Sequence, residues 1–357
     1  MANRFVLNET SYHGKGAIQS IVTELAQRGL VNPMVCSDPD LVKFGVTQKV
    51  ISLLEEAGVK YNLNTNIKPN PTIENVQHGV EEYKKNNNDC IIAVGGGSSI
   101  DTAKGIGIII TNPEFADVRS LEGVAPTKNP CAPIIAVPTT AGTAAEVTIN
   151  YVITDEEKNR KMVCVDVHDI PVVAVVDPDM MSTMPKGLTA ATGMDALTHA
   201  MEGYITKAGW LIPDMFHINA MSLIYKNLEK AANEKDEYAV DQVAYGQYIA
   251  GMGFSNVGLG IVHSMAHSLG AYFDTPHGVA NALLLPHVLK FNGVVCPQLY
   301  RNMGKSFGLD MSNTTDEEAV DKVVEAVKLE MVEIINQGGW FYETHWDAWT
   351  WNRKIIT

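Results

Sequence analysis

The chain has no hydrophobic run long enough to cross a bilayer and no cluster of basic residues. Its longest apolar run lies around residues 105–110, whereas a transmembrane helix needs about 20 apolar residues. The N-terminal stretch MANRFVLNETSYHGKG lacks the apolar segment of a signal peptide. Acidic residues (41) outnumber Lys and Arg (27), and the formal net charge is −14. These absences argue against a membrane or nucleic acid as partner, and we expect a cytoplasmic protein.

Cysteine is scarce, and several common motifs are missing. The five Cys are odd in number and scattered without a CxxC pair, so we expect reduced thiols and no disulfide framework. The chain has neither the GxGxxG nor the GxxxxGK[ST] nucleotide fingerprint. The stretch from His263 to His267 reads HSMAH and lacks the Glu of the zinc-protease motif HExxH. A zinc protease is therefore excluded, and any nucleotide site must use a different loop.

The apolar pattern changes its period near Met184. Before it, continuous apolar runs alternate with amphipathic helical segments, which is typical of a parallel sheet covered on both faces. We predict a hairpin at 150–166, strands at 5–7, 32–37, 90–94, 133–137 and 172–176, and helices at 17–29, 41–58 and 72–86. After residue 184, helical spacing takes over. With 357 residues, the chain is long enough for two domains, predicted at 1–183 and 184–330.

A glycine-rich stretch, Gly95-Gly96-Gly97-Ser98, directly follows the strand predicted at 90–94. Glycines between a strand and a helix let backbone N–H groups approach a phosphate, whose charge the helix N-terminus favours. A tight turn would also need glycine, but three glycines and a serine favour phosphate binding. Asp38 follows an early strand and suits a ribose hydroxyl, although it could equally cap a helix. The threonines after the strand at 133–137 could bind a ribose or diphosphate, or only form a turn.

One carboxylate and several histidines recur at helical spacing in the second half. Asp195 and His199 are four residues apart, so they share one face of a helix. His263 and His267 repeat this spacing on another predicted helix, and His277 follows in a predicted turn. Any one of them could be an ordinary polar residue, but the grouping favours a divalent transition-metal site. Because the glycine loop and the metal helices fall in different domains, we expect the active site between them.

The stretch 331–357 is unlike the rest. Four of the five Trp lie between positions 340 and 351, without apolar period or helix cap. We expect this tail not to be a selected part of the fold.

Four motifs in order carry a family resemblance: GGGSSIDTAK, PTTAGTAAEVT, GMDALTHAMEGY and GIVHSMAHSLGAYFDTPHGVANALLLPH. Over roughly residues 1–330 the chain resembles the iron-containing (group III) alcohol dehydrogenases. The stretches NPEFADVRSLEGVAPTKNP and AEVTINYVITDEEKNRKMVCVDVHDIP are similar to the branch that interconverts lactaldehyde and 1,2-propanediol. The resemblance implies a nucleotide-binding α/β domain followed by an all-helical metal-binding domain, a fold shared with dehydroquinate synthase. It also implies a small alcohol or aldehyde substrate and a homodimer formed through the N-terminal domain, partly by its first strands.

The resemblance also implies residue roles. Iron, or alternatively zinc, would be held by Asp195, His199, His263 and His277. NAD would bind with Asp38 on the adenosine ribose and with the loop residues Gly96, Gly97 and Ser98 at the diphosphate. The rest of the cofactor site would comprise Asn70, Asp101, Thr139, Thr140, Thr143 and Lys161. His267 would face the nicotinamide or substrate as a proton relay or positioning group, and Asn150 and Phe254 would shape the substrate pocket.

Three alternatives remain open. The first alternative is a glycerol dehydrogenase-like zinc enzyme, because imidazole suits zinc as well as iron. A dehydroquinate synthase-like lyase is a second, but it would need basic residues near the metal, and none of the Lys between 195 and 277 adjoins a proposed ligand. The third is a binding protein without catalysis, because the family pattern is lost near residue 330. A frameshift there would explain the Trp-rich tail and would remove helices that complete the second core.

Overall fold

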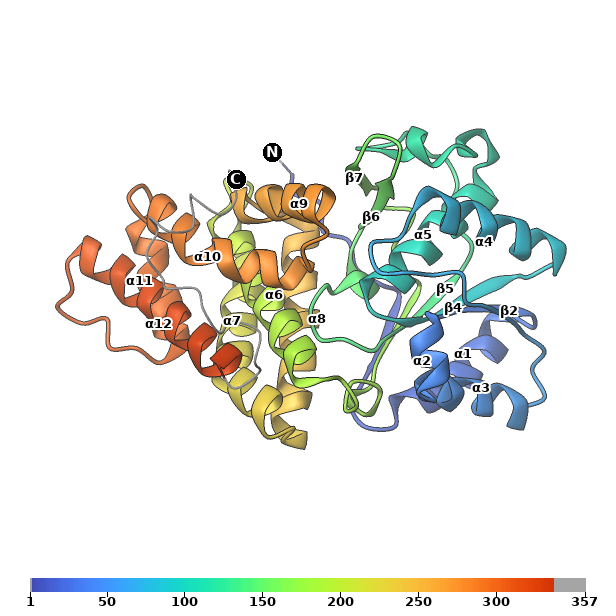
Figure 1. Cartoon of the computed structure of the whole chain (residues 1–357), viewed down its shortest axis with the longest axis horizontal. Coiled ribbons are helices and arrows are strands. Elements are labelled where there is room, and N and C mark those ends of the chain that lie inside the picture. The colour runs from blue at the N-terminus through green and yellow to red at the C-terminus, as the bar shows by residue number, and fades with distance from the viewer. Residues whose placement is uncertain (1, 337–357) are drawn as a thin grey trace.

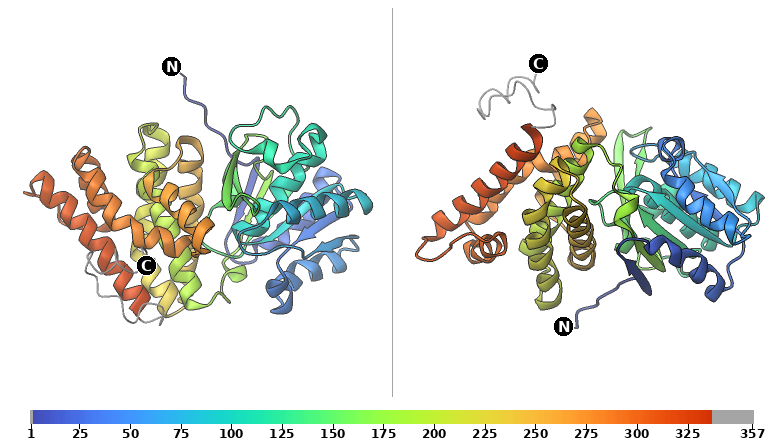
Figure 2. Two further views of the ribbon diagram at one scale, coloured as in Figure 1. Left: turned by 45° about the horizontal axis from the view of Figure 1, so that its top comes forward. Right: turned by 90° about the horizontal axis from the view of Figure 1, so that it is seen from below.

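The computed structural model describes residues 2–336, in a sheet-containing half and a helical half that lie side by side (Figure 1). Two further views show the same separation (Figure 2). The predicted boundary after residue 183 falls in the link between the 3-10 helix η5 (Pro178–Met180) and helix α6 (Lys186–Ile205). Within residues 2–336, no helix combines the length and apolar character that crossing a membrane requires.

The first half is built on a parallel sheet of six strands in the order β1-β8-β5-β4-β2-β3. Its strands are β1 (Thr10–His13), β2 (Pro33–Cys36), β3 (Asn62–Asn64), β4 (Cys90–Gly95), β5 (Ile134–Pro138) and β8 (Val173–Val176). Every residue of β2, β4, β5 and β8 is buried, as expected for continuous apolar strands in a parallel sheet. A separate antiparallel hairpin pairs β6 (Asn150–Asp155) with β7 (Arg160–Val165).

Helices cover both faces of this sheet because alternate residues of each strand point to opposite sides. In β4, Ile91 and Ala93 pack with the helices at 73–85 and 97–111, whereas Ile92 and Val94 pack with those at 20–28 and 46–56. The helices of this half are α1 (Ser20–Arg28), α2 (Pro39–Lys43), α3 (Val46–Glu56), α4 (Ile73–Lys85) and α5 (Gly97–Thr111). Short 3-10 helices are η1 (Ala17–Gln19), η2 (Pro113–Phe115), η3 (Val118–Leu121) and η4 (Ala145–Val147). The predicted α/β class of the first half is confirmed.

The second half contains only helices among its described elements. After α6 come α7 (Leu211–Asn233), α8 (Glu237–Val257), α9 (Ile261–Phe273), α10 (His277–Gly293), α11 (Pro297–Phe307) and α12 (Asp316–Asn336). Their apolar side chains share one continuous core, which includes the buried Met331. The predicted start of the aberrant tail at 331 therefore falls inside α12, and the Trp-rich stretch 340–351 lies outside the described residues.

The prediction of a strand at Phe5–Leu7 is wrong, because this segment lies against the helical half. Asn256 of α8 bonds both backbone groups of Val6: its Oδ1 accepts from the Val6 N–H at 2.8 Å, and its Nδ2 donates to the Val6 carbonyl at 3.1 Å. The ring of Phe5 stacks on that of Phe216. A side-chain amide thus satisfies backbone groups that a neighbouring strand would otherwise bond. The first strand of the sheet is instead β1.

The single helix predicted at 41–58 is also wrong. The chain breaks at Gly45, whose φ of 77° lies in the left-handed region, and this break separates α2 from α3.

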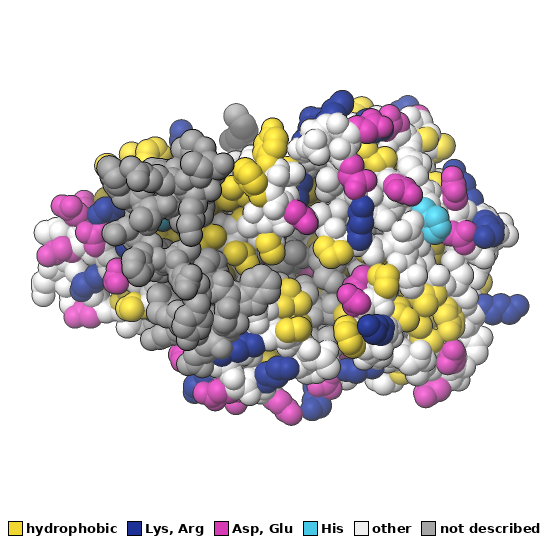
Figure 3. All heavy atoms as spheres, viewed as in Figure 1, with side chains coloured by type: hydrophobic (Ala, Val, Ile, Leu, Met, Phe, Trp, Pro, Cys, Tyr) yellow, Lys and Arg dark blue, Asp and Glu magenta, His cyan; other side chains and the backbone are white. Residues whose placement is uncertain are grey.

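On the face drawn in Figure 3, basic and acidic side chains are interspersed over both halves.

Candidate metal and cofactor site

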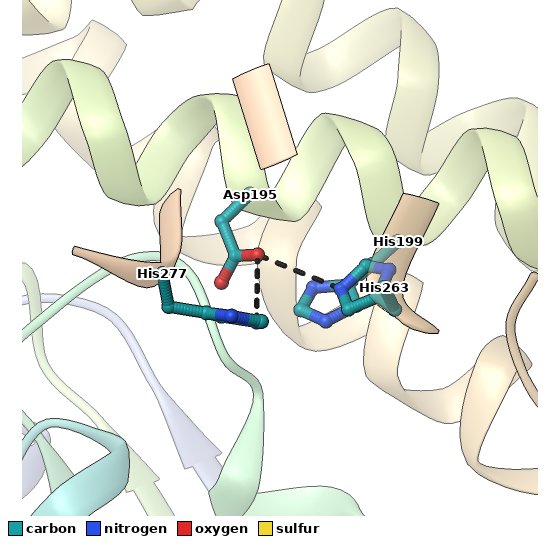
Figure 4. A group of neighbouring side chains, drawn as sticks. All are labelled: Asp195, His199, His263 and His277. Carbon is teal, nitrogen blue, oxygen red and sulfur yellow. Dashed lines mark ion pairs between the residues drawn. The ribbon is translucent and has the colours of Figure 1, made fainter. Parts of the chain in front are cut away.

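Four side chains from three helices meet in the helical half (Figure 4). Asp195 and His199 lie one turn apart on α6, His263 is on α9, and His277 is the first residue of α10. The turn predicted at His277 is therefore wrong, since Pro276 is the N-cap of a helix that starts there. One potential ligand atom from each of the four residues lies within 4.8 Å of all the others. Nε2 of His263 and of His277 lie 3.6 and 3.5 Å from Asp195 Oδ1.

Close contact between α10 and α6 places His277 in this cluster. A Cβ atom on Gly278 would lie only 2.2 Å from the carbonyl oxygen of Ala191. Glycine is therefore the residue that allows the start of α10 to approach α6 this closely.

The electrostatics of the cluster favour a cation. Burial alone would raise the pKa of Asp195, but the imidazoles of His199, His277 and His263 outweigh burial and hold that pKa well below its usual range. Burial lowers the pKa of His199 to about 3 and that of His277 to about 4. Burial also disfavours charge on His263, yet hydrogen bonds with Asp195 and Glu202 prevail and raise its pKa to about 9. An ionised carboxylate, two uncharged imidazoles and a third imidazole that favours positive charge show that the cluster favours a cation, as a divalent metal site does.

Two buried residues in contact with the cluster were not predicted. Glu202 accepts a hydrogen bond from His263 Nδ1 at 2.7 Å. Asn281 donates through Nδ2 to Asp195 Oδ1 at 2.6 Å. Helical spacing was the available signal, because Glu202 is three residues after His199 and Asn281 is four residues after His277.

His267 lies one turn beyond His263 on α9. Its ring stacks on that of His277 with a centroid separation of 5.3 Å. Burial, and to a smaller extent repulsion from His277, His263 and Lys161, lowers the pKa of His267 to about 3. The imidazole is therefore uncharged near neutral pH.

The glycine-rich loop joins the end of β4 to the start of α5. Gly96 is the N-cap of α5, and a Cβ atom there would lie 3.1 Å from Thr140 Oγ1. On Gly97 a Cβ atom would lie 2.9 Å from Thr143 Cγ2. Because β4 and β5 are neighbours in the sheet, the loops that follow them meet at one edge. This packing needs the glycines. It leaves the N-terminus of α5 at the edge formed by the carboxyl ends of the strands, a position suited to a phosphate.

A chain of hydrogen bonds joins the two halves. Lys161 Nζ donates to Asn70 Oδ1 at 2.8 Å, and Asn70 Nδ2 donates to Asp274 Oδ1 at 2.8 Å. Asp274, which lies at the end of α9, was not predicted. Burial lowers the pKa of Lys161. Close by, Asp101 accepts from the Val152 N–H at 3.0 Å, and burial raises the pKa of Asp101 to about 7.

A cavity of about 500 Å³ lies between the halves, and most predicted site residues line it. From the sheet half these are Asn70, Gly97, Ser98, Asp101, Thr143, Asn150 and Lys161, and from the helical half His199, Phe254, His263, His267 and His277. Phe254 stacks on His199 at 4.3 Å between ring centroids. Asp195 lies buried behind the lining residues.

The remaining predicted cofactor residues do not line this cavity. Thr139 is buried, and Thr140 packs against Gly96. Asp38 is the N-cap of α2, where its Oδ1 accepts from the N–H groups of Asp40 and Leu41 at 3.0 Å each. The capping alternative for Asp38 is thus observed, and within the described part of the chain its second carboxylate oxygen accepts no hydrogen bond.

Comparisons with known proteins agree with this architecture. Residues 8–178 match the family model described as iron-containing alcohol dehydrogenase, and residues 189–337 match the C-terminal model of the same family. Lactaldehyde reductase of Escherichia coli is 53% identical over 328 residues, which cover 92% of this chain and 85% of that protein.

Solved structures are also similar. An alcohol dehydrogenase from Oenococcus oeni is 37% identical with a TM-score of 0.90, covering 95% of this chain and 90% of that one. A sulfoacetaldehyde reductase from Bifidobacterium kashiwanohense, solved in complex with NAD+, is 28% identical with a TM-score of 0.83. That match covers 94% of this chain and 86% of the other. With both halves matched, the chain belongs to the iron-containing alcohol dehydrogenase family and is an alcohol/aldehyde oxidoreductase.

Proposed function

We propose that the chain catalyses the NAD-dependent, iron-assisted interconversion of lactaldehyde and 1,2-propanediol. The observation that carries the proposal is one cavity lined both by the glycine-rich loop and by histidines of the metal cluster. The 53% identity to E. coli lactaldehyde reductase supports this substrate pair.

The metal would be held by Asp195, His199, His263 and His277. One potential ligand atom of each residue lies within 4.8 Å of the others, and three of the four side chains are buried. One carboxylate and three imidazoles suit ferrous iron and zinc alike. A metal in this position supplies Lewis acidity to the alcohol or aldehyde oxygen of the substrate.

NAD would lie across the sheet edge, with its diphosphate at Gly96, Gly97 and Ser98. The N-terminus of α5 favours the negative charge, and threonine hydroxyls from the next loop lie beside it. Asp38 would bind the adenosine ribose through its second carboxylate oxygen, while Asn70, Asp101 and Lys161 would line the remainder with Thr139, Thr140 and Thr143. The similar sulfoacetaldehyde reductase was solved with NAD+, which supports the choice of cofactor.

The protein's own groups would orient the substrate and handle its proton. His267, uncharged and next to His277, is the proposed proton relay to the substrate hydroxyl. Phe254 closes one wall of the pocket by stacking on His199, and Asn150 offers a polar contact. Enclosure between the two halves would limit the access of water to the reacting atoms.

The first experiment is NAD-linked oxidation of 1,2-propanediol by anaerobically purified chain, loaded in parallel with ferrous iron and with zinc. Activity with iron alone supports the proposal. Activity with zinc alone, extending to glycerol, would favour a glycerol dehydrogenase-like zinc enzyme. Metal and NAD binding without turnover of either diol would instead indicate a binding protein.

We also propose a homodimer formed through the N-terminal half. β1 is an edge strand of the sheet, with its second side unpaired among the described strands. Sedimentation equilibrium would test this, and a monomer at micromolar concentration would contradict it.

A further inference from the structure

Glu202 contacts the metal cluster without belonging to the four proposed ligands. It lies on α6, three residues after His199, and its side chain is 1% exposed. Its Oε2 accepts hydrogen bonds from His263 Nδ1 at 2.7 Å and from the His263 backbone N–H at 3.2 Å. Its Oε1 accepts from the backbone N–H of Val262 at 2.7 Å. All three contacts bridge α6 to the first turn of α9.

These contacts determine which nitrogen of His263 can bind a metal. Both oxygens of Glu202 accept hydrogen bonds from backbone N–H groups, so the ring nitrogen 2.7 Å from Oε2 is the donor of its bond and carries a proton. Glu202 therefore keeps a proton on Nδ1, and Nε2, on the side where Asp195 Oδ1 lies 3.6 Å away, is the nitrogen that can exchange its proton for a metal. Carboxylates that hold metal-binding histidines in this way orient the ring and increase the basicity of the binding nitrogen.

Glu202 also replaces a missing helix cap. The N-cap of α9 is Gly260, which has no side chain to bond the free N–H groups of the first turn. A Cβ atom on Gly260 would lie 2.6 Å from Glu202 Oε1, so the glycine leaves room for the carboxylate. A negative charge at a helix N-terminus is favourable in addition to the hydrogen bonds. One side chain therefore links the helix of Asp195 and His199 to the helix of His263.

We propose that Glu202 is a positioning residue of the metal site, which keeps the proton of His263 on Nδ1 and fixes α9 against α6. The inference rests on the proposed metal ligands, and it assigns to Glu202 no contact with metal or substrate.

The decisive variant is Glu202→Gln. It keeps the volume of the side chain but introduces an amide donor that must face either the Val262 N–H or His263 Nδ1. If the amide donates to Nδ1, the ring proton moves to Nε2 and blocks the metal-binding lone pair. The matched control is Tyr204→Phe, which removes a partly buried hydrogen bond of α6, from Asn302 Nδ2 to the Tyr204 hydroxyl at 2.8 Å.

The measurement is the zinc dissociation constant of the full chain, determined by competition with a chromophoric chelator. We expect Glu202→Gln to raise it by about 10–100-fold and Tyr204→Phe to leave it near the wild-type value. Equal affinity of wild type and Glu202→Gln, or equal weakening in both variants, would overturn the inference. A wild-type chain that binds no zinc would overturn the metal assignment itself, so the two failures can be told apart.

Nitrogen-15 NMR of the zinc-loaded wild type gives a second test that does not depend on how the variant folds. We expect a slowly exchanging proton on His263 Nδ1 and zinc on Nε2. Zinc on Nδ1 would contradict the proposed role of Glu202.

Discussion

Asp195 and Asp101 both lie on helices beside the same cavity, but their surroundings move their pKa values in opposite directions. Three imidazoles around Asp195 outweigh its burial and keep it ionised. Asp101 is influenced mainly by burial, which lysines and one backbone N–H offset only in part, and its pKa rises to about 7. The helical half thus concentrates negative charge where a cation would bind, whereas the sheet half presents backbone N–H groups and hydroxyls.

Two different kinds of site therefore meet in the cavity. The proposed metal site is made of side chains held by helix packing, and the proposed cofactor site is made largely of backbone at the edge of a sheet. Substitutions in one half should change one binding step and leave the other intact.

The largest effect is expected from Asp195→Asn, which removes the anionic member of the cluster while keeping its shape. Metal affinity should fall by more than the about 10–100-fold expected for a supporting residue, and diol oxidation should be lost with it. Metal content after dialysis against a chelator measures the first effect, and NAD binding by calorimetry should stay unchanged. Asp310→Asn, on the surface of the helical half, is the control. A variant that retains metal would remove Asp195 from the ligand set.

An intermediate effect is expected from Gly97→Ala. The new methyl group would lie 2.9 Å from Thr143 Cγ2 and occupy the space where the two loops meet. The KM for NAD should rise roughly tenfold or more, equivalent to about 1.4 kcal/mol, while metal content stays constant. Gly107→Ala, on the same helix and away from the loop, is the matched control. An unchanged KM for NAD would argue against a diphosphate at this position.

The smallest effect is expected on the pH dependence of stability, which the variant Asp101→Asn tests. The folded protein releases the Asp101 proton near pH 7, whereas the unfolded chain releases it near pH 4. The protonated carboxyl therefore stabilises the fold fully below about pH 4, and this contribution is lost as the pH rises to about 7. Asn does not ionise and can still accept from the Val152 N–H. The melting temperature of the variant, relative to that of wild type, should therefore be higher at pH 8 than at pH 5. If the melting temperatures of the two proteins change with pH in parallel, the raised pKa of Asp101 is refuted.

The sequence allowed several elements to be predicted because their patterns are local. The apolar run at 90–94 followed by glycines led correctly to β4 and the start of α5. The four-residue spacing of Asp195 and His199 placed both on one face of α6. The family resemblance was confirmed by the matching domain models.

Other features could not be read from local patterns. Phe5–Leu7 has the composition of a strand, but Asn256, 250 residues later, satisfies the backbone of Val6. His277 follows Thr275-Pro276, which resembles a turn, yet a helix begins there. Glu202 and Asn281 had suitable spacing, but many polar residues on helices share that spacing without contacting a functional group.

By itself, the sequence determined which residues share a helix face and where a strand passes into a glycine loop, because helical and strand periods depend on neighbours in the chain. The tertiary structure alone decided that α6, α9 and α10 converge. Glu202 meets His263 across 61 positions, and Asn281 meets Asp195 across 86. It also decided the opposite ionisation of Asp101 and Asp195, because a pKa depends on burial and on charges that packing brings within a few ångströms.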